Sequence, residues 1–296
     1  MKTLIKVSRF FFFKTQKEKL FILKSLRRGK VFPLLLYILY RLRLTSQILV
    51  VRKFYKIKLS YSPYALWLYF HRNAVRKEEE FVHFLLDEGN IFVDAGAHLG
   101  TVSLTASQGV GAFGKVIAIE PHPKTFSYLK ENISLAFYKN ISLVSAGVGE
   151  RNEISFLSSS YVSDMNYIGE VGIKVKVMTL ETICASLKKI SLLKIDVEGY
   201  ELQALLGLGK SLQKVEAILF ESSPSSFTRY NYTLSDIVKF LEKSGFTVYR
   251  FLGALPDEIV PITASHQTKT RYEDLIAFNG FGKIHFQKKG GKILPS

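Results

Sequence analysis

Cysteine and long apolar runs are scarce in this 296-residue chain. The single cysteine, Cys184, excludes an intramolecular disulfide and fits a reducing, cytoplasmic location. The longest apolar run, Val31 to Tyr40, is half the length that a transmembrane helix needs. Extending the run brings in Arg41 and Arg43, and inserting each arginine near the middle of a bilayer costs ~2.5 kcal/mol or more. No small-residue cleavage site follows the short patch Phe10 to Phe13. We therefore expect neither a membrane span nor a secretory signal.

Acidic residues are nearly absent from the first 77 positions. This segment holds 19 Lys and Arg against one acid, Glu18, whereas the remaining residues carry 22 basic and 24 acidic side chains. Its basic residues alternate with large apolar ones, which is typical of amphipathic helices on anionic membrane surfaces. We expect a basic helical extension at 1–75 that makes peripheral contact through 1–60 with the inner face of a membrane. A cap packed on the body stays open as an alternative, and a nucleic-acid arm is the least favoured.

Potential metal ligands of the zinc type are few and scattered. The six His and the one Cys form no cluster in the sequence, so no metal site is expected. A Mg²⁺ ion held near Asp196 by carboxylates alone stays open, because hard cations need only oxygen ligands. No feature of the sequence specifies an oligomeric state.

The segment IFVDAGAHLG, residues 91–100, has the composition of a nucleotide-binding loop. Asp94 closes a buried strand, and Gly96 and Gly100 permit a sharp turn into the next helix. Small side chains let a ligand lie against the backbone, near the N–H groups of the helix N-terminus. Glu120 ends a second strand, where an acid commonly accepts hydrogen bonds from both ribose hydroxyls. The glycine spacing departs from G-x-G-x-x-G, which weakens the case for a dinucleotide.

A third motif, SLLKIDVEGYE at 191–201, places several charges at the end of a buried strand. Lys194, Asp196 and Glu198 are two residues apart, so they share one face if the strand persists that far. Burying charged groups at such a position costs free energy, so we expect them either to form ion pairs or to take part in binding or catalysis. We expect Asp196 to orient or deprotonate an acceptor hydroxyl and Lys194 to keep it ionised, with Glu198 as a weaker catalytic candidate. A purely structural Lys194–Asp196 ion pair is the alternative.

Together, DAGAHLG, AIEPHP and KIDVEGYE resemble the FkbM family of S-adenosylmethionine-dependent methyltransferases, over roughly 91–250. The resemblance implies an α/β Rossmann-like class I methyltransferase fold, with a mostly parallel seven-stranded sheet and helices on both faces. It implies S-adenosylmethionine as cofactor and O-methylation of a hydroxyl on a sugar, glycan precursor or related metabolite. His98 departs from the asparagine that is usual in the family.

The expected cofactor site combines the loop at 91–100, the end of the second strand at 115–120 and the end of a third strand expected at 141–146. Its residues are Asp94, Gly96, Ala97, His98, Gly100, Glu120, Pro121, Ser145 and Ala146. The last two would lie beside the adenine, by analogy with such folds. Enzymes that methylate amino groups of bases usually carry an Asn/Asp-Pro-Pro-aromatic run at the end of the strand that corresponds to 191–201, and this run is absent here. A small-molecule, sugar or lipid-linked glycan acceptor is therefore expected, rather than nucleic acid.

Two other functions stay open, and several boundaries are expected. An NAD(P)-dependent Rossmann oxidoreductase would share Glu120, and a non-catalytic membrane-associated scaffold would keep the fold without turnover. The catalytic domain is expected at 76–285, with an inserted hairpin at 152–178 and a disordered tail at 286–296. Glu221 is a further polar candidate at the pocket rim. Candidates for a substrate entrance are the aromatic residues Tyr61, Tyr64, Trp67, Tyr69 and Phe70, although such clusters are more often packing.

Overall fold

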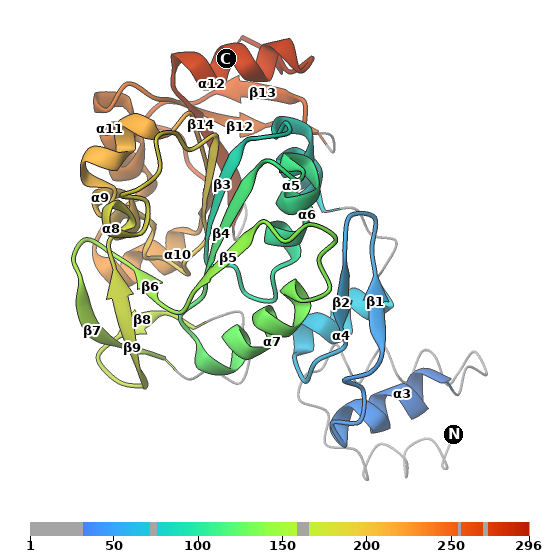
Figure 1. The fold of residues 1–296 in the computed structure, drawn as a ribbon. Helices are drawn as coiled ribbons and strands as arrows, with labels where there is room; N and C mark the ends of the chain where they lie inside the picture. The colour runs from blue at the N-terminus through green and yellow to red at the C-terminus, as the bar shows by residue number, and fades with distance from the viewer. Residues whose placement is uncertain (1–31, 72–75, 159–165, 254–255, 269–271, 296) are drawn as a thin grey trace, which may run out of the picture.

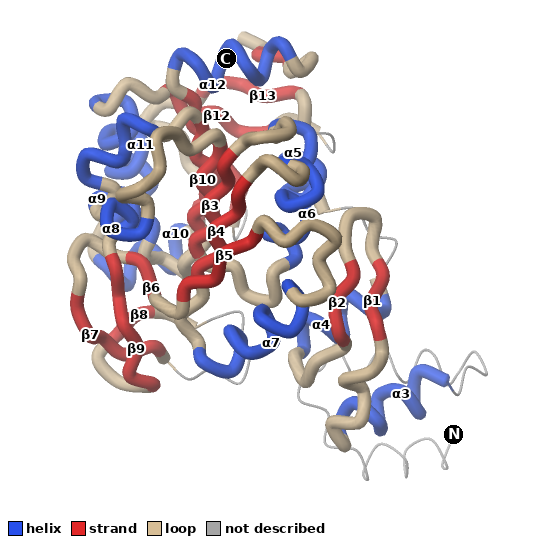
Figure 2. Tube along the Cα trace, viewed as in Figure 1, coloured by secondary structure: helices blue, strands red, loops and turns tan. Residues whose placement is uncertain are grey.

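The computed structural model describes residues 32–71, 76–158, 166–253, 256–268 and 272–295 (Figure 1). A nine-stranded sheet forms the centre of the body, with helices on both faces (Figure 2). In spatial order its strands are β15 (Lys292–Ile293), β13 (Glu258–Pro261), β12 (Thr247–Phe251), β14 (Glu273–Phe278), β11 (Ala217–Ser222), β10 (Leu192–Ile195), β3 (Ile91–Ala95), β4 (Lys115–Ile119) and β5 (Ile141–Val144). The seven strands from β12 to β5 form the expected sheet, and β13 and β15 extend it at one edge.

The direction of β14 distinguishes this sheet from a dinucleotide-binding sheet. The strands β5, β4, β3, β10 and β11 are parallel neighbours. In contrast, β14 lies between β11 and β12 and is antiparallel to both. An antiparallel strand inserted at this place is the arrangement of class I methyltransferases, so the expected fold is confirmed.

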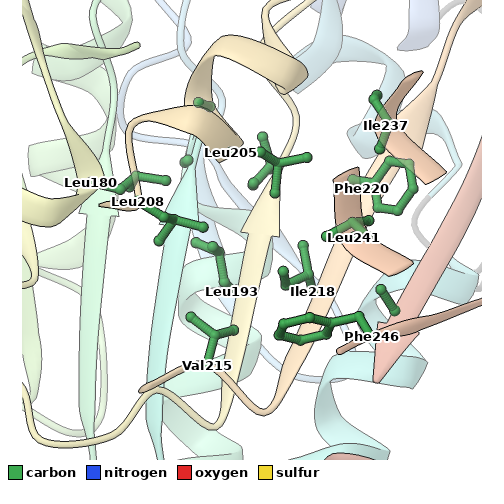
Figure 3. Close-up of a cluster of buried hydrophobic side chains, with 14 of the residues drawn as sticks. Leu180, Leu193, Leu205, Leu208, Val215, Ile218, Phe220, Ile237, Leu241 and Phe246 are labelled. Carbon is green, nitrogen blue, oxygen red and sulfur yellow. The ribbon is translucent and has the colours of Figure 1, made fainter. Parts of the chain in front are cut away.

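Helices cover both faces of the sheet because each face carries apolar side chains. One face packs against α8 (Leu180–Ile183), α9 (Glu201–Leu206) and α11 (Leu234–Lys243), and the other against α5 (Lys77–Leu85), α6 (Thr101–Val110) and α12 (Gly280–Lys288). Figure 3 shows part of the first core, where Leu193, Ile218 and Phe220 meet Leu205 and Leu241. Burying each such side chain contributes about 1.5–3 kcal/mol, so these contacts fix the strands that present the site.

Strand β10 is buried on both sides and positions the motif at its end. Leu193 and Ile195 face the core beneath α9, whereas Leu192 faces the α5 side. Side chains alternate along a strand, so Lys194 also points toward the α5 side. This alternation brings the ammonium group of Lys194 to the first turn of α5.

The expected inserted hairpin forms a small sheet of its own. Strands β7 (Glu153–Leu157) and β9 (Ile173–Met178) pair in antiparallel fashion, and β6 (Gly147–Val148) and β8 (Ile168–Gly169) complete the sheet. Part of the connecting loop, 159–165, lies outside the described residues. The remaining elements of the body are the helix α7 (Pro123–Ile133), the short helix α10 (Pro224–Phe227) and the 3₁₀ turns η1 (Gly209–Lys214) and η2 (Thr228–Tyr230).

The described part of the N-terminal extension is helical only in part. A hairpin of β1 (Leu49–Val51) and β2 (Lys56–Lys58) separates α3 (Phe32–Arg41) from α4 (Pro63–Phe70). The hairpin was not predicted, because its strands are only three residues long and the periodicity of the segment favours helix. Buried apolar side chains of the extension pack against Leu99 and Leu104 of the body. Residues 1–31, which carry ten of the 19 basic side chains, lie outside the described part.

The expected disordered tail at 286–296 is wrong as far as Pro295. Helix α12 continues to Lys288, and β15 pairs with β13 in parallel register. Phe286 explains the difference, since it is fully buried against Phe278 and Phe81. Ile293 packs against the same cluster, and the polar composition of the tail hid both apolar contacts.

Candidate functional site

A cavity of about 280 Å³ lies at the carboxyl ends of β3, β4, β10 and β11. The predicted residues that line it are Gly96, Ala97, His98, Glu120, Pro121, Lys194, Asp196 and Glu198. A smaller cavity of about 30 Å³ shares Gly96 and Pro121 with it, and there Ala146 forms part of the wall. The residues from three separate sequence motifs therefore meet at one edge of the sheet, where ligands of open α/β folds bind.

Three predicted residues lie outside the cavity walls. Asp94 is fully buried behind the loop, where its Oδ2 accepts a 2.5 Å hydrogen bond from Ser103 Oγ. Gly100 caps α6 in the left-handed region, and a Cβ there would lie 2.6 Å from Leu129 Cδ1. Ser145 is exposed to solvent. Asp94 and Gly100 support the loop on the side away from the cavity. Ser145 does not reach the cavity, since β5 ends one residue before it.

Gly96 permits the closest approach in the site. Its φ is +88°, and a Cβ added to it would lie 1.8 Å from the carbonyl oxygen of Asp196. The N–H groups of Gly96 and Ala97 both donate to the carbonyl of Ile119, at 3.0 and 2.9 Å. The loop is thus fixed between the ends of β4 and β10, and only glycine fits there.

Glu120 is buried at the end of β4 and anchored by backbone groups. Its Oε2 accepts from the N–H of His98 at 3.0 Å, and its Oε1 accepts from the N–H of His122 at 2.9 Å. Burial raises the pKa of Glu120 to about 7, although both N–H groups act in the opposite direction. A carboxylate offers about four lone-pair sites, so acceptor capacity remains on both oxygens for a ligand in the cavity.

His98 is held in an unusual conformation in the same loop. Its φ is +50°, and its ring lies 5.2 Å from the ring of Tyr64. Burial lowers the pKa of His98 to about 4, so the imidazole is neutral at pH 7. A neutral ring here can donate or accept a hydrogen bond without adding charge to the cavity.

Lys194 lies at the centre of a cluster of carboxylates. Its Nζ is 3.1 Å from Asp196 Oδ2, 3.4 Å from Glu78 Oε1 and 3.7 Å from Asp94 Oδ1. Burial opposes the charged form, but the three carboxylates outweigh it and raise the pKa of Lys194 well above its usual value. The ammonium group is therefore charged, and all three carboxylates contact it. Of the three, Asp196 and Glu78 line the cavity, whereas Asp94 does not.

Glu198 does not share a strand face with Lys194 and Asp196. Strand β10 ends at Ile195, and Glu198 has a φ of +57° in the turn that follows. Glu201 holds this turn, because its Oε1 accepts from the N–H groups of Val197 at 3.1 Å and Gly199 at 3.2 Å. Glu198 still lines the cavity, but it reaches the wall through a turn rather than through strand pleating.

Among the wall residues that sequence reasoning missed, two are charged, Arg76 and Glu78. Arg76 bonds the Tyr64 hydroxyl and lies 3.0 Å from Glu78 Oε2. Of the five aromatic candidates for an entrance, Tyr64 lines this cavity. The polar candidate Glu221, on β11, lines it too. The only sequence feature that points to Arg76 and Glu78 is the charged run RKEEE at the start of a predicted helix. The sequence predicts the helix, but it does not predict that this helix lies beside Lys194.

The described extension is fastened to the same wall. Tyr55 donates a 2.8 Å hydrogen bond to Glu79, and Arg52 lies 3.8 Å from that carboxylate. Glu79 also lies 3.6 Å from Arg76. The extension therefore contributes directly to the packing that orients the cavity wall.

Comparisons with known proteins identify relatives of this chain. Residues 94–248 match the model of the methyltransferase FkbM domain. The hexuronic acid methyltransferase AglP of Haloferax volcanii is 29% identical over 154 residues, which is 50% of this chain and 63% of AglP. The match thus spans less than two thirds of that relative.

Two solved structures are similar at low identity. A methyltransferase FkbM from Methylobacillus flagellatus KT has 16% identity and a TM-score of 0.42, with 71% of this chain and 46% of that chain covered. A SAM-dependent O-methyltransferase from Thermotoga maritima has 13% identity and a TM-score of 0.41, with 70% and 66% covered. The family assignment rests on the match to residues 94–248, which make up just over half of the chain.

Proposed function

Since the chain belongs to the FkbM methyltransferase family, we propose that it transfers a methyl group from S-adenosylmethionine to a hydroxyl of a sugar or glycan precursor. The observation that carries this proposal is the convergence of Gly96, Glu120 and Asp196 on one cavity. We assign the catalytic domain to the body from residue 76 onward, including α12 and β15.

The residues of the two cavities fit the cofactor. Gly96 presents its backbone, without a side chain, to the larger cavity, and Glu120 has remaining acceptor capacity for a ribose diol. Ala146 and Pro121 border the smaller cavity, where an adenine would find apolar walls. When bound, S-adenosylmethionine supplies an electrophilic methyl group on its sulfonium. The chain binds and orients this group and its acceptor, which accounts for most of the rate gain in such reactions.

Asp196 is the proposed acceptor-orienting residue and proton acceptor. Its carboxylate lines the cavity and is held by Lys194 at 3.1 Å. With the cofactor in place, this carboxylate would take the proton that the acceptor hydroxyl loses on methylation. Lys194, which also contacts two other carboxylates, stays charged and holds the Asp196 carboxylate in place at the cavity wall.

A sugar acceptor is supported by the printed activity of one relative. The relative from Haloferax volcanii is named a hexuronic acid methyltransferase. After β10 the chain reads DVEGYE, without the proline-rich slot of enzymes that methylate bases. Hydroxylated rings are therefore the first acceptors to test.

Calorimetric titration with S-adenosylhomocysteine tests the cofactor assignment. We expect micromolar binding that weakens about 100-fold in Glu120→Ala, because loss of hydrogen bonds to a charged group costs about 1.5–3 kcal/mol. Glu242→Ala, an exposed position on α11, serves as the matched control and should bind normally. Folded protein that binds NADH or NADPH in place of S-adenosylhomocysteine would refute the assignment in favour of an oxidoreductase, and absence of all three would favour a scaffold.

The pH dependence of the same titration identifies Glu120 independently. Its pKa is raised to about 7, and the ionised carboxylate is the form that accepts from both ribose hydroxyls. Affinity should therefore rise by up to about tenfold between pH 6 and pH 8 as Glu120 loses its proton. The rise should be absent in Glu120→Gln.

We further propose that the extension contacts anionic membranes. None of the described helices is both long and apolar enough to cross a bilayer. However, Leu35, Leu42 and Leu44 are 51%, 61% and 63% exposed on or just after α3, beside the exposed Arg43. Exposed apolar side chains next to basic ones favour insertion at an anionic interface.

Flotation with vesicles of phosphatidylglycerol and phosphatidylcholine tests this contact. Replacing Leu42 and Leu44 together by glutamate should reduce the bound fraction roughly tenfold, because it removes apolar area and adds negative charge. Phe281→Glu is the matched control, since Phe281 is 75% exposed on α12 at the other end of the molecule (Figure 1). Equal losses in both variants, or no flotation of the wild type, would contradict the proposal.

A further inference from the structure

A second large cavity, of about 500 Å³, lies between the β1–β2 hairpin and the body, and we call it the hairpin cavity. Residues 52–56 of the hairpin form one wall, and the other walls include His83 on α5, Leu104 on α6 and residues 135–137 after α7. Among the described residues, none lines both this cavity and the cavity that contains Gly96. The proposed methyl transfer therefore does not account for the hairpin cavity.

The lining of the hairpin cavity is basic. It includes Arg52, Lys53 and Lys56, and none of its described residues is acidic. Arg52 lies 3.8 Å from Glu79, and Lys53 Nζ lies 2.8 Å from Glu80, so two of these cations already have an anionic partner. Lys56 is exposed, and its ammonium group forms no ion pair and no hydrogen bond with the part of the chain that the structure describes. The cavity thus offers the charge of Lys56 to an anionic ligand.

The charge of Lys56 matches a phosphodiester. His83 adds no charge at pH 7, because burial and the neighbouring Lys53 lower the pKa of its imidazole below the usual range. A phosphodiester carries one negative charge, whereas a phosphomonoester carries about 1.5 to 2 at pH 7. A single ammonium group therefore neutralises the diester but not the monoester.

Apolar side chains lie exposed at the rim of the same cavity. Phe137 is 77% exposed and Leu135 is 38% exposed, and both line the cavity. Val51, which is 54% exposed, is the register partner of Lys56, so the two side chains share one face of the hairpin. Exposed apolar side chains beside polar ones mark interaction sites. A ligand that fits this surface combines one negative charge with apolar chains.

The hairpin cavity lies on the flank of the molecule that we propose to contact the membrane. Tyr40 of α3 and Ile57 of β2 belong to one buried cluster, so α3 and the hairpin lie side by side (Figure 1). Building on that membrane contact, we propose that the hairpin cavity binds one anionic phospholipid, with its phosphodiester at Lys56 and its acyl chains against Leu135 and Phe137. A soluble phosphate ester would satisfy Lys56 but leave both apolar side chains in water.

Monomeric lipids test this inference on the full-length protein with labelled leucine methyl groups. Below its critical micelle concentration, dihexanoylphosphatidylglycerol should shift the NMR signals of Leu104 and Leu135 and leave those of Leu205, in the core beneath α9, in place. It should bind at least roughly tenfold more tightly than dihexanoylphosphatidylcholine, whose headgroup is neutral overall. Glycerophosphoglycerol, which is the same headgroup without chains, should bind more weakly still. Equal affinity of the two lipids, or of the lipid and its headgroup, would overturn the inference.

Substitutions at the cavity rim separate the charged contact from the apolar one. Lys56→Glu should weaken the binding of dihexanoylphosphatidylglycerol at least roughly tenfold, and Phe137→Ser should weaken the binding of both lipids roughly tenfold. Both positions are exposed, so neither change removes a core contact. Lys288→Glu and Phe281→Ser make the same changes at exposed positions of α12 and should leave binding normal. Equal losses at Lys56 and Lys288 would show that the lipid has no specific site at the hairpin.

The two lipid experiments fail in distinguishable ways. Binding of the monomeric lipid by a protein that does not float with vesicles would refute the membrane contact and retain the lipid site. Flotation that depends on Leu42 and Leu44, without any shift of Leu135 by the monomeric lipid, would retain the membrane contact and refute the lipid site. Neither result affects the proposed methyl transfer, which the titration with S-adenosylhomocysteine tests separately.

Discussion

Asp196→Asn should lower kcat for methyl transfer by about 10²- to 10⁴-fold, the usual contribution of a positioned general base. The amide cannot accept the hydroxyl proton, yet it has nearly the same shape and still accepts a hydrogen bond from Lys194. Product formation with the sugar that turns over fastest measures this loss. Binding of S-adenosylhomocysteine should be nearly unchanged, because the carboxylate acts on the acceptor.

Asp87→Asn is the matched control for this change. Asp87 is an exposed carboxylate that pairs with Lys289 at 2.6 Å, on the loop before β3 at the opposite end of that strand from the cavity. Its loss should leave kcat unaltered. If Asp196 has only a structural role as a partner of Lys194, Asp196→Asn will lower the unfolding free energy and leave kcat near the wild-type value. That result would exclude Asp196 as the base.

Gly96→Ala should give the largest loss of stability among single substitutions in the loop. The added methyl group would lie 1.8 Å from the Asp196 carbonyl oxygen, so β3 and β10 would have to separate or the loop would have to refold. We expect a loss of at least ~3 kcal/mol in the free energy of unfolding by urea, together with loss of S-adenosylhomocysteine binding.

Gly245→Ala separates backbone strain from collision. Gly245 has a φ of +85°, close to the +88° of Gly96, but a Cβ there would meet nothing within 4 Å. Only the left-handed conformation is then penalised, at about 1–2 kcal/mol. Equal losses in the two variants would show that the contact with Asp196 carries no special constraint.

The sequence contained enough information to predict the centre of the site. The glycine loop, Glu120 and the charges after β10 each follow a strand, and ends of parallel strands meet at one edge. In each case the signal is local, because a short motif and the strand beside it determine the position. The long connection before β14 permits its insertion between β11 and β12, but the sequence alone does not show it.

Contacts between distant segments were not predictable in the same way. Glu78 reaches Lys194 only because α5 covers the face of β10 on which Lys194 lies. Glu201 looked like part of a charged signature, but its carboxylate binds the backbone of the turn before it. No periodic pattern in the sequence predicts either contact, because both depend on how the helices and strands pack together.

The position of β14 affects the order in which the protein matures during synthesis. This strand, Glu273–Phe278, occupies an inner position between β11 and β12, although it is formed from one of the last segments of the chain. Until it has left the ribosome, β11 and β12 each expose an unpaired edge, which is a site for wrong pairing. The domain therefore cannot close its sheet progressively from the N-terminus, because the gap between β11 and β12 stays open until residue 278 has arrived.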